Sequence, residues 1–302
     1  MEKRALSVCL ITYNHINYIR QAIDSVIMQK VNFSWELIIA DDFSTDGTRE
    51  IIKEYKEKYP EFIRLILQEK NVGPAQNWID LMKAPESKFV SYFEGDDYWT
   101  DPDKLQKQFD FMEQHNEYVM CFHNAMLINE VNTTSHFFGE YDKSEYTGTD
   151  LFENWIIPTA SIFFKNVLPK ELPDFFKHAT HGDLALFVYL AEFGKVKYLE
   201  GVMSVYRVNS NGSTQSLLKG ISHNVKHLYQ LELMVEYFGE KYKGHLKQRM
   251  ANYLMPTGYL YARAGDKKNA MMCFKKAWKM KKTETLRFCK YFFGSVYYFI
   301  KS

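Results

Sequence analysis

The chain has 302 residues, of which 46% are hydrophobic and 25% are charged. This is the composition of an ordinary soluble protein, and the length allows one large domain with an appendage, or two domains. The net charge of +1 excludes an overall basic or acidic protein but hides an asymmetry, because residues 219–302 carry +12 and residues 1–218 carry −11. An acidic part suits a divalent cation, and a basic part suits an anionic surface.

Cysteine usage and the N-terminus indicate the compartment. Cys9, Cys121, Cys273 and Cys289 show no CxxC spacing and fall in apolar or helical stretches, which predicts buried free thiols in a reducing compartment. The first apolar stretch, Leu6–Ile11, is shorter than the core of a signal peptide, which needs about 7–15 residues. We therefore expect a cytoplasmic protein.

Strand and helix patterns alternate through the first 115 residues. In chain order they are a strand at Leu6–Thr12, a helix at Tyr18–Gln29, a strand at Leu37–Ala40, a helix at Asp46–Tyr59, a strand at Phe62–Leu67, a helix at Pro74–Met82, a strand at Lys88–Phe93 and a helix at Asp101–His115. Ser44 or Asp46 is the expected N-cap of the second helix, and Pro102 is expected in the first turn of the fourth. Repeated β-α-β units predict a doubly wound, mostly parallel, Rossmann-like α/β sheet.

The pattern changes twice in the second half. After a strand-like run at Val119–Ile128, residues 130–160 suggest loops and irregular strands, and the α/β pattern then returns in the segments Ile162–Phe164, Asp183–Phe193, Val196–Leu199 and Met203–Arg207. From about residue 219 the sequence predicts only helices, at roughly 221–238, 244–264, 267–280 and 284–300. We therefore expect an α/β domain over 1–218 and an all-helical C-terminal extension over 219–302. Within the extension, Tyr259–Asp266 and the small residues after it resemble a single tetratricopeptide-type hairpin, which favours a helical cap over a repeat array.

Two pairs of adjacent aspartates are the most informative feature of the chain. Asp41-Asp42 and Asp96-Asp97 each follow a short apolar run that reads as a buried strand. Adjacent carboxylates repel one another, so such a pair is usually balanced by something positive, most often a metal ion. Ligands also bind at the carboxyl ends of strands in open α/β sheets. The alternative is that one aspartate of each pair caps a helix or a turn.

Four sequence blocks resemble those of family-2 glycosyltransferases with the GT-A fold, and they occur in the same order. The blocks are Ser7–Asn14 (SVCLITYN), Glu36–Thr48 (ELIIADDFSTDGT), Asn71–Gly73 (NVG) and Phe93–Trp99 (FEGDDYW). A weaker resemblance continues through His181–Asp183 and Val205–Asn209 to about residue 215, and the C-terminal helices lie outside it. The resemblance implies a nucleotide-sugar donor, with UDP favoured over GDP or dTDP on family frequency alone.

The resemblance also implies roles for residues after the first two strands. Thr12, Tyr13 and Asn14 are expected beside the nucleotide, with Tyr13 on the base or ribose unless it is an ordinary turn residue. Asp42 is expected to accept a hydrogen bond from the base, while Asp41 supports it or holds the turn. Asn71 belongs to the same nucleotide-binding set, although Gln76 stands near the usual arginine of that block.

The second aspartate pair matches the metal motif of the family. Asp97 is the expected direct ligand of Mn²⁺ or Mg²⁺, and Asp96 is expected to hold ribose or sugar hydroxyls. A cation bridging the phosphates stabilises the charge on the departing diphosphate, and hard oxygen ligands suit both ions. Glu94 is a further candidate by proximity.

Asp183 is the expected general base, because it opens the apolar helix where the family places that carboxylate. One carboxylate suffices to take the proton of an acceptor hydroxyl. A plain N-cap is the alternative, and the two roles are compatible. Asn209 stands where many relatives carry a histidine that helps to hold metal or diphosphate, so that role is open here. Arg207 is expected either on phosphate or in a structural salt bridge.

These expectations combine into one function and one alternative. We expect an inverting, metal-dependent glycosyltransferase that acts on a hydroxyl of a glycan or lipid-linked oligosaccharide. The alternative is a non-catalytic sugar-nucleotide-binding protein with a helical interaction tail. Leu286–Ile300 is too short to span a membrane, and it is expected either as an interfacial helix on the anionic inner face of the plasma membrane or as a packed terminal helix. A nucleic-acid partner is not expected, because the aromatics of the tail cluster in one apolar helix.

Overall fold

The computed structural model describes residues 4–153, 156–180, 182–209 and 220–280, together with Tyr291 and Ser295; for Glu153 it describes the backbone alone. It divides into two compact units, Met1–Leu172 with Gly182–Ser210, and Pro173–His181 with Asn211–Ser302. The predicted domain boundary after residue 218 falls outside the described residues and stays a prediction.

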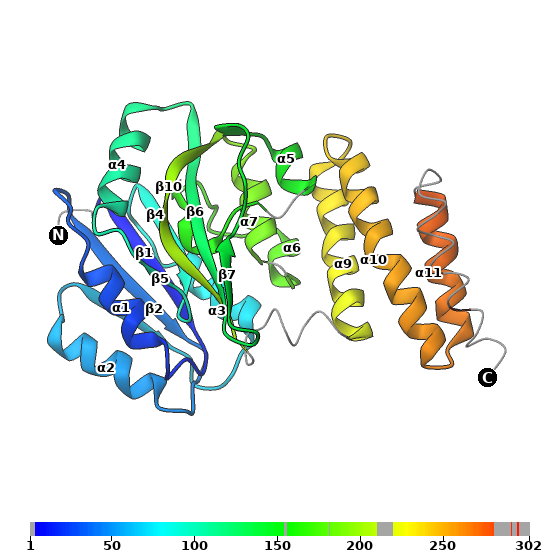
Figure 1. The fold of residues 1–302 in the computed structure, drawn as a ribbon, viewed down its shortest axis with the longest axis horizontal. Coiled ribbons are helices and arrows are strands. Elements are labelled where there is room, and N and C mark those ends of the chain that lie inside the picture. The colour runs from blue at the N-terminus through cyan, green and yellow to red at the C-terminus, as the bar shows by residue number, and fades with distance from the viewer. Residues whose placement is uncertain are drawn as a thin grey trace. The chain divides into compact units, whose positions relative to one another are not determined.

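The first unit holds one large sheet (Figure 1). Its first half contains β1 Leu6–Thr12, α1 Ile19–Ile27, β2 Trp35–Asp41, α2 Thr48–Lys58, β3 Ile63–Leu67, α3 Pro74–Met82, β4 Phe89–Glu94, β5 Tyr98–Trp99 and α4 Lys104–Gln114. Its second half contains β6 Tyr118–Asn129, β7 Thr134–Phe137, β8 Glu145–Tyr146, α5 Gly148–Glu153, the 3₁₀ turn η1 Thr159–Ser161, β9 Phe163–Lys165, α7 Gly182–Leu190 and β10 Lys195–Val208.

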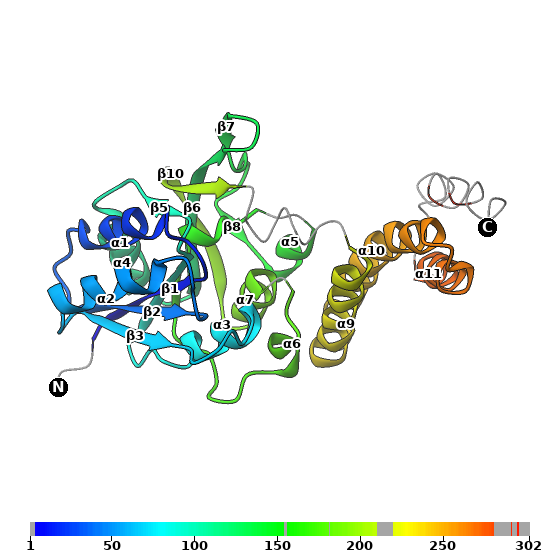
Figure 2. The ribbon, with the colours of Figure 1, turned by 90° about the horizontal axis from the view of Figure 1, so that it is seen from below.

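The strand order is β3-β2-β1-β4-β9-β6-β10-β5, with β7 paired to β6 and β8 paired to β10. The predicted strands β1 to β4 pair in parallel, and so do β6 and β10. Strand β9 is antiparallel to its neighbours β4 and β6, and β5 is antiparallel to β10. Sequence patterns missed β5 and anticipated β7 and β8 only as unplaced irregular strands within residues 130–160, because these strands are two to four residues long and too short to show a period. Figure 2 shows the β6–β7 hairpin projecting from the unit.

Helices cover both faces of the sheet. Helices α1, α2 and α4 lie on one side, and α3 and α7 lie on the other (Figure 1). On the first side, alternate residues of β1 (Leu6, Val8 and Leu10) are fully buried in one core with Ile23 of α1 and Leu105 of α4. The intervening residues of each buried strand face the second layer of helices, which is why these strands read as continuous apolar runs.

Three local predictions were wrong. Helix α2 is capped by Gly47, whose φ of 102° suits glycine, and neither Ser44 nor Asp46 is the N-cap. Helix α4 begins at Lys104, so Pro102 precedes it. The two strands predicted around residue 200 form one strand, β10, whose register shifts between Tyr198 and Ser204 around Gly201 at a φ of 123°.

The second unit consists of helices, α6 Asp174–Lys177, α9 Ile221–Phe238, α10 Lys243–Arg263 and α11 Lys267–Met280. Helices α10 and α11 pack closely as a hairpin. A Cβ on Gly258 would lie only 2.9 Å from Cε1 of Phe274, and the small residues Ala262 and Ala270 are buried in the same cluster as Phe274. Of the helix predicted at 284–300, only Tyr291 and Ser295 are described, and Tyr291 packs against this cluster.

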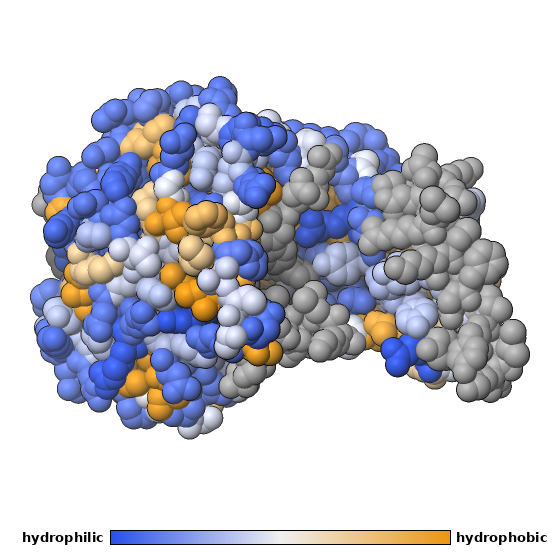
Figure 3. Space-filling view, viewed as in Figure 1, coloured by the Kyte–Doolittle hydropathy of each residue, from blue (hydrophilic) through white to orange (hydrophobic). Residues whose placement is uncertain are grey.

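Three of the four cysteines, Cys9, Cys121 and Cys273, are buried and free as predicted, and Cys289 lies outside the described residues. In the described part of the chain, none of the helices combines the length and the apolar character that a membrane span requires. The face of the first unit in Figure 3 is mainly hydrophilic, with small apolar patches separated by polar side chains.

Candidate active site

Parallel pairing places the predicted residues at one edge of the sheet. Thr12 at the end of β1 pairs with Asp41 at the end of β2, and Ile11 pairs with Glu94 at the end of β4. The segments that follow these strands therefore emerge side by side, and they contain Tyr13, Asn14, Asp42, Asp96 and Asp97. This edge is where ligands bind in open α/β folds.

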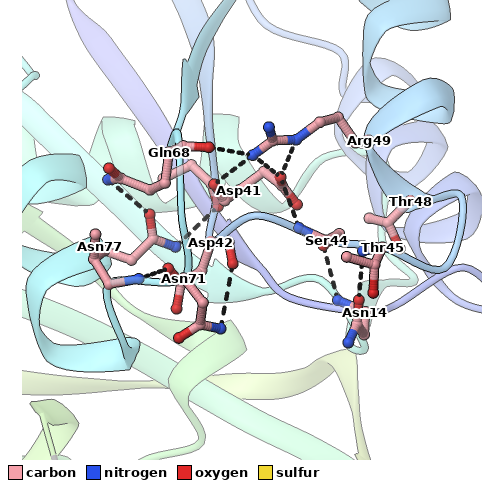
Figure 4. Close-up of polar contacts among 12 residues, drawn as sticks. Asn14, Asp41, Asp42, Ser44, Thr45, Thr48, Arg49, Gln68, Asn71 and Asn77 are labelled. Carbon is pink, nitrogen blue, oxygen red and sulfur yellow. Dashed lines mark hydrogen bonds and ion pairs between the residues drawn. The ribbon is translucent and has the colours of Figure 1, made fainter.

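Mutual hydrogen bonds join the segments after β1 and β2 (Figure 4). The backbone N–H of Asn14 donates to Ser44 Oγ at 2.9 Å, and the N–H of Thr45 donates to Asn14 Oδ1 at 2.9 Å. Asn14 has a φ of 54°, a conformation that asparagine tolerates better than most residues. Its side chain therefore holds the second segment in place, while Tyr13 beside it remains 45% exposed.

Asp41 is a structural residue with a buried ion pair. Its Oδ2 accepts from Arg49 Nε at 2.6 Å and from the backbone N–H of Ser44 at 3.1 Å. Arg49 also donates to the carbonyl of Gln68 at 2.7 Å, which fixes the guanidinium between β2 and the segment after β3 (Figure 4). This arrangement matches the alternative in which Asp41 holds the turn.

Asp42 joins β2 to the segment before α3. Its Oδ1 accepts from the backbone N–H of Val72 at 2.7 Å and its Oδ2 from that of Gly73 at 3.0 Å. Burial raises the pKa of the Asp42 carboxyl, although these two hydrogen bonds act in the opposite direction. Asn71 Nδ2 lies 3.4 Å from the carbonyl of Asp42, so Asn71 adjoins the same site. Each carboxylate oxygen of Asp42 accepts one of these bonds and has a second lone pair. The predicted hydrogen bond from a base to Asp42 would use that lone pair, and it stays a prediction.

Gly95 allows the second aspartate pair to approach β1. A Cβ at this position would lie 2.9 Å from both His15 Nδ1 and Thr12 Oγ1. The backbone N–H of Gly95 donates to the carbonyl of Ile11 at 2.8 Å. Any larger residue here would push the Asp96-Asp97 segment away from the end of β1.

Asp97 is a buried carboxylate with only one of its two oxygens hydrogen-bonded to a described residue. It is 1% exposed, and its Oδ1 accepts from the backbone N–H of Arg207 at 2.8 Å. Its Oδ2 is buried and makes no hydrogen bond with any described residue. Burial, together with the charges of Asp96 and Glu94, raises the pKa of the Asp97 carboxyl well above its ordinary value. Such a group favours either a proton or a cation at Oδ2.

Asp96 contacts residues after β1 and at the end of β10. Its Oδ2 accepts from Asn209 Nδ2 at 3.0 Å and lies 4.0 Å from His15 Nε2. Its carbonyl accepts from Arg207 Nη1 at 2.6 Å. Arg207 also lies against Glu130, with 3.4 Å between Nε and Oε1, so the salt-bridge reading of Arg207 matches these contacts.

Asp183 lies at the start of α7, and its Oδ1 accepts from the backbone N–H of Leu184 at 2.8 Å. Its charge acts on two residues of β4. Burial and the charges of Asp96 and Asp183 raise the pKa of Glu94 to about 8, and Asp183 also contributes to the raised pKa of Tyr92. The predicted base therefore lies within electrostatic range of Tyr92 and Glu94, the last of which ends the strand before the Asp96-Asp97 pair.

The donor set at Asp97 fits a hard divalent cation, because the unpartnered buried oxygen is what such an ion prefers. Among the described residues, no group of three or more His, Cys, Asp or Glu side chains is placed to hold a metal on its own. Protein sites for Mg²⁺ often use one or two carboxylates and leave the other positions to phosphates and water. Asp97, with Asp96 beside it, fits that pattern.

Sequence reasoning missed three residues that shape the site. His15, Arg49 and Gly95 are in the matched blocks or beside them, but each acts through a contact with a residue distant in sequence. Gly95, between Glu94 and two aspartates at a strand end, was the most accessible signal, because glycine there commonly marks a close backbone approach.

Comparison with known proteins finds a matching family model and similar proteins. The model of the family described as "Glycosyl transferase family 2" matches residues 7–168. The uncharacterized protein Rv1520 of Mycobacterium tuberculosis is 34% identical over 215 residues, which are 68% of this chain and 60% of the relative. The chain thus spans about 60% of the length of that relative. The putative teichuronic acid biosynthesis glycosyltransferase TuaG of Bacillus subtilis is 30% identical over 220 residues, 72% of this chain and 84% of TuaG.

Solved structures share the fold at low sequence identity. S. aureus TarS 1-349 in complex with UDP-GlcNAc aligns at a TM-score of 0.56 and 16% identity, covering 91% of each chain. The mannosyltransferase PcManGT from Pyrobaculum calidifontis, in complex with GDP-Man and Mn²⁺, aligns at a TM-score of 0.50 and 15% identity, covering 99% of this chain and 86% of PcManGT. The predicted α/β sheet of the GT-A type, followed by C-terminal helices, is confirmed.

Proposed function

The chain belongs to glycosyl transferase family 2, and we propose that it transfers a sugar from a nucleoside-diphosphate sugar to an acceptor hydroxyl with inversion at the anomeric carbon. The observation that carries this proposal is Asp97, a buried carboxylate at the same edge of the sheet as Asp42, with one oxygen that makes no hydrogen bond with any described residue.

The donor is proposed to lie along the ends of β1, β2 and β4. Thr12, Tyr13, Asn14, Asp42 and Asn71 line the nucleotide part, and Asp96 adjoins the ribose or the sugar. A UDP-sugar is the favoured donor, and the UDP-GlcNAc complex of TarS is consistent with that choice. The GDP-Man complex of PcManGT makes GDP-sugars the second series to test.

Asp97 would hold Mn²⁺ or Mg²⁺, with Asp96 next to it. When bound, the cation supplies a counter-charge for the departing diphosphate. Arg207 keeps the Asp97 carboxylate in place through its backbone N–H, and Gly95 keeps the segment close to β1. The Mn²⁺ in PcManGT is consistent with this proposal.

Asp183 is proposed to take the proton of the acceptor hydroxyl. The acceptor oxygen forms a bond to the anomeric carbon while the bond from that carbon to the diphosphate oxygen breaks, so the proton ends on the Asp183 carboxyl. The hydrogen bond from the N–H of Leu184 orients that carboxyl without neutralising it. A single displacement inverts the anomeric configuration, and an NMR spectrum of the product that shows retention would exclude it.

The acceptor is proposed to be a hydroxyl of a glycan or lipid-linked oligosaccharide. The described part of the second unit supports a place at an anionic bilayer, because α11 carries five lysines and no acidic residue. The tail predicted to dock lies mostly outside the described residues. Truncation after Lys282 should weaken binding to vesicles that contain phosphatidylglycerol, whereas unchanged binding would remove the tail from this role.

The proposed activity is tested by screening UDP-, GDP- and dTDP-sugars with Mn²⁺ or with EDTA. A thermal shift for one donor that depends on Mn²⁺, followed by slow hydrolysis of that donor, is the expected result. Binding without any hydrolysis or transfer would favour the non-catalytic alternative. The absence of metal-dependent binding to every nucleotide sugar would overturn the proposal.

A further inference from the structure

Phe43 stands out at the candidate site because its conformation and its exposure are both unfavourable. It follows Asp42 at the end of β2 with a φ of 62°, in the left-handed region that costs an L-residue with a bulky side chain. The residue is also 39% exposed. Glycine or asparagine would fit this turn with less strain, and a polar side chain would be better hydrated.

The left-handed turn at Phe43 is enforced from both sides. Before it, the backbone N–H of Asp42 donates to the carbonyl of Thr12 at 3.1 Å. After it, the N–H of Ser44 donates to Asp41 Oδ2, and Ser44 and Thr45 are both hydrogen-bonded to Asn14 (Figure 4). The backbone at Phe43 is therefore held regardless of the side chain, and the ring itself needs a separate explanation.

The ring is supported on one face by a rigid cation. The guanidinium carbon of Arg49 lies 5.1 Å from the ring centroid, within the range of a cation–π contact. Arg49 cannot follow a moving ring, because its nitrogens are bonded to Asp41 and to the carbonyl of Gln68. An aromatic ring that is fixed behind and exposed in front is suited to stacking.

From these contacts we propose that Phe43 is an aromatic platform for the nucleobase of the donor, acting beside Tyr13 on the neighbouring strand end. The inference rests on the proposed function, because the edge of the sheet where both rings lie is the proposed nucleotide site. Tyr13 follows β1 and Phe43 follows β2, and the two strands are paired in register up to Thr12 and Asp41. Stacking accepts any base, so the platform adds affinity and leaves the choice of base to hydrogen bonds.

The test compares three substitutions by calorimetry with UDP and with inorganic pyrophosphate, each in the presence of Mn²⁺. Phe43→Tyr keeps the ring, Phe43→Leu keeps an apolar side chain with the same strain, and Phe43→Asn relieves the strain. The Tyr variant should bind UDP within about twofold of the parent, and the Leu and Asn variants should lose roughly tenfold or more. Pyrophosphate affinity should stay unchanged in all three.

The thermal midpoint separates the platform from a structural role. The Asn variant should unfold at or above the temperature of the parent, because the strain of the turn is reduced, while it binds UDP less well. Unchanged UDP binding in the Leu and Asn variants would overturn the inference. An equal loss of pyrophosphate binding would also overturn it, since the ring would then act on the fold of the site. A parent protein that binds no nucleotide would instead refute the proposed function.

Discussion

The backbone N–H of Arg207 donates to Asp97 Oδ1 at 2.8 Å, and this bond ties β10 to the segment after β4. The guanidinium of the same residue donates to the carbonyl of Asp96 at 2.6 Å and lies 5.1 and 4.4 Å from the rings of Tyr18 and Tyr98. Arg207 thus holds the backbone of Asp96 and the side chain of Asp97. Its guanidinium is occupied by protein contacts, which favours a positioning role over a contact with phosphate.

Replacement of the Arg207 guanidinium should therefore release the carbonyl of Asp96 and shift Asp97 with it, although the bond from the backbone N–H of residue 207 to Asp97 is kept. In Arg207→Lys the charge remains but the planar fork that reaches several acceptors is lost, so we expect Mn²⁺ affinity to fall about tenfold and stability by roughly 1–3 kcal/mol. Electron paramagnetic resonance of Mn²⁺ and chemical denaturation measure the two effects. Arg64→Lys, at a half-exposed arginine that lies 3.5 Å from Glu36, is the control. Full Mn²⁺ affinity in the Lys variant would mean that positive charge alone suffices.

Asp97→Asn should weaken Mn²⁺ binding and raise the thermal stability of the metal-free protein. The change replaces a buried carboxyl, whose ionisation is opposed by burial and by the charges of Asp96 and Glu94, with a neutral amide, so we expect the variant to unfold at a higher temperature than the parent at pH 7 in EDTA. Mn²⁺ affinity should fall at least tenfold, because the amide offers a weaker ligand. Asp110→Asn, near the exposed end of α4, is the control and should change neither property. A less stable Asp97→Asn protein in EDTA would contradict our reading of that carboxyl.

The positions of the site residues were predictable from sequence, and their contacts were not. Strand ends at Thr12 and Asp41 follow from runs of apolar residues, and parallel pairing then brings them to one edge. The ion pair between Asp41 and Arg49 depends instead on how α2 enters after Gly47, which no periodicity encodes. Arg207 reaches Asp97 only because β10 continues through an irregular register that sequence patterns divided into two strands.

Gly95→Ala should disturb the site through one methyl group. The new Cβ would lie 2.9 Å from Thr12 Oγ1 and His15 Nδ1, so the Asp96-Asp97 segment must shift. We expect a loss of about 1–3 kcal/mol in the free energy of unfolding, together with weaker Mn²⁺ binding. Gly244→Ala is the matched control, because that glycine lies in α10 with nothing within 4 Å of the added Cβ, and it should stabilise by about 0.5–1 kcal/mol. Equal effects at both glycines would contradict the close approach.

Asp183→Asn should separate chemistry from binding. The amide keeps the hydrogen bond from the N–H of Leu184 but cannot take a proton, so transfer should fall by about 10² to 10⁴ while the donor binds within about twofold of the parent. The rate of sugar transfer and the dissociation constant of the donor are the two measurements. Asp174→Asn, on an exposed aspartate paired with Lys177, is the control. Turnover near that of the parent would remove Asp183 from the base role.

Lys104 should make the stability of the protein depend on pH. Its ammonium group is fully buried, lies 4.0 Å from the Trp99 ring centroid and donates to Gln108 Oε1 at 2.8 Å, and burial lowers the pKa of Lys104 to about 7. Between pH 7 and about 10.5 the unfolded chain binds a proton here that the folded chain releases. The free energy of unfolding should therefore rise with pH across that window, by roughly 4 to 5 kcal/mol from this group alone. In Lys104→Met the rise should disappear, which urea denaturation of both proteins at several pH values would measure. Lys107→Met, at a half-exposed lysine paired with Asp101, should keep the rise, and parallel pH profiles for the parent and Lys104→Met would show that the amine stays charged in the core.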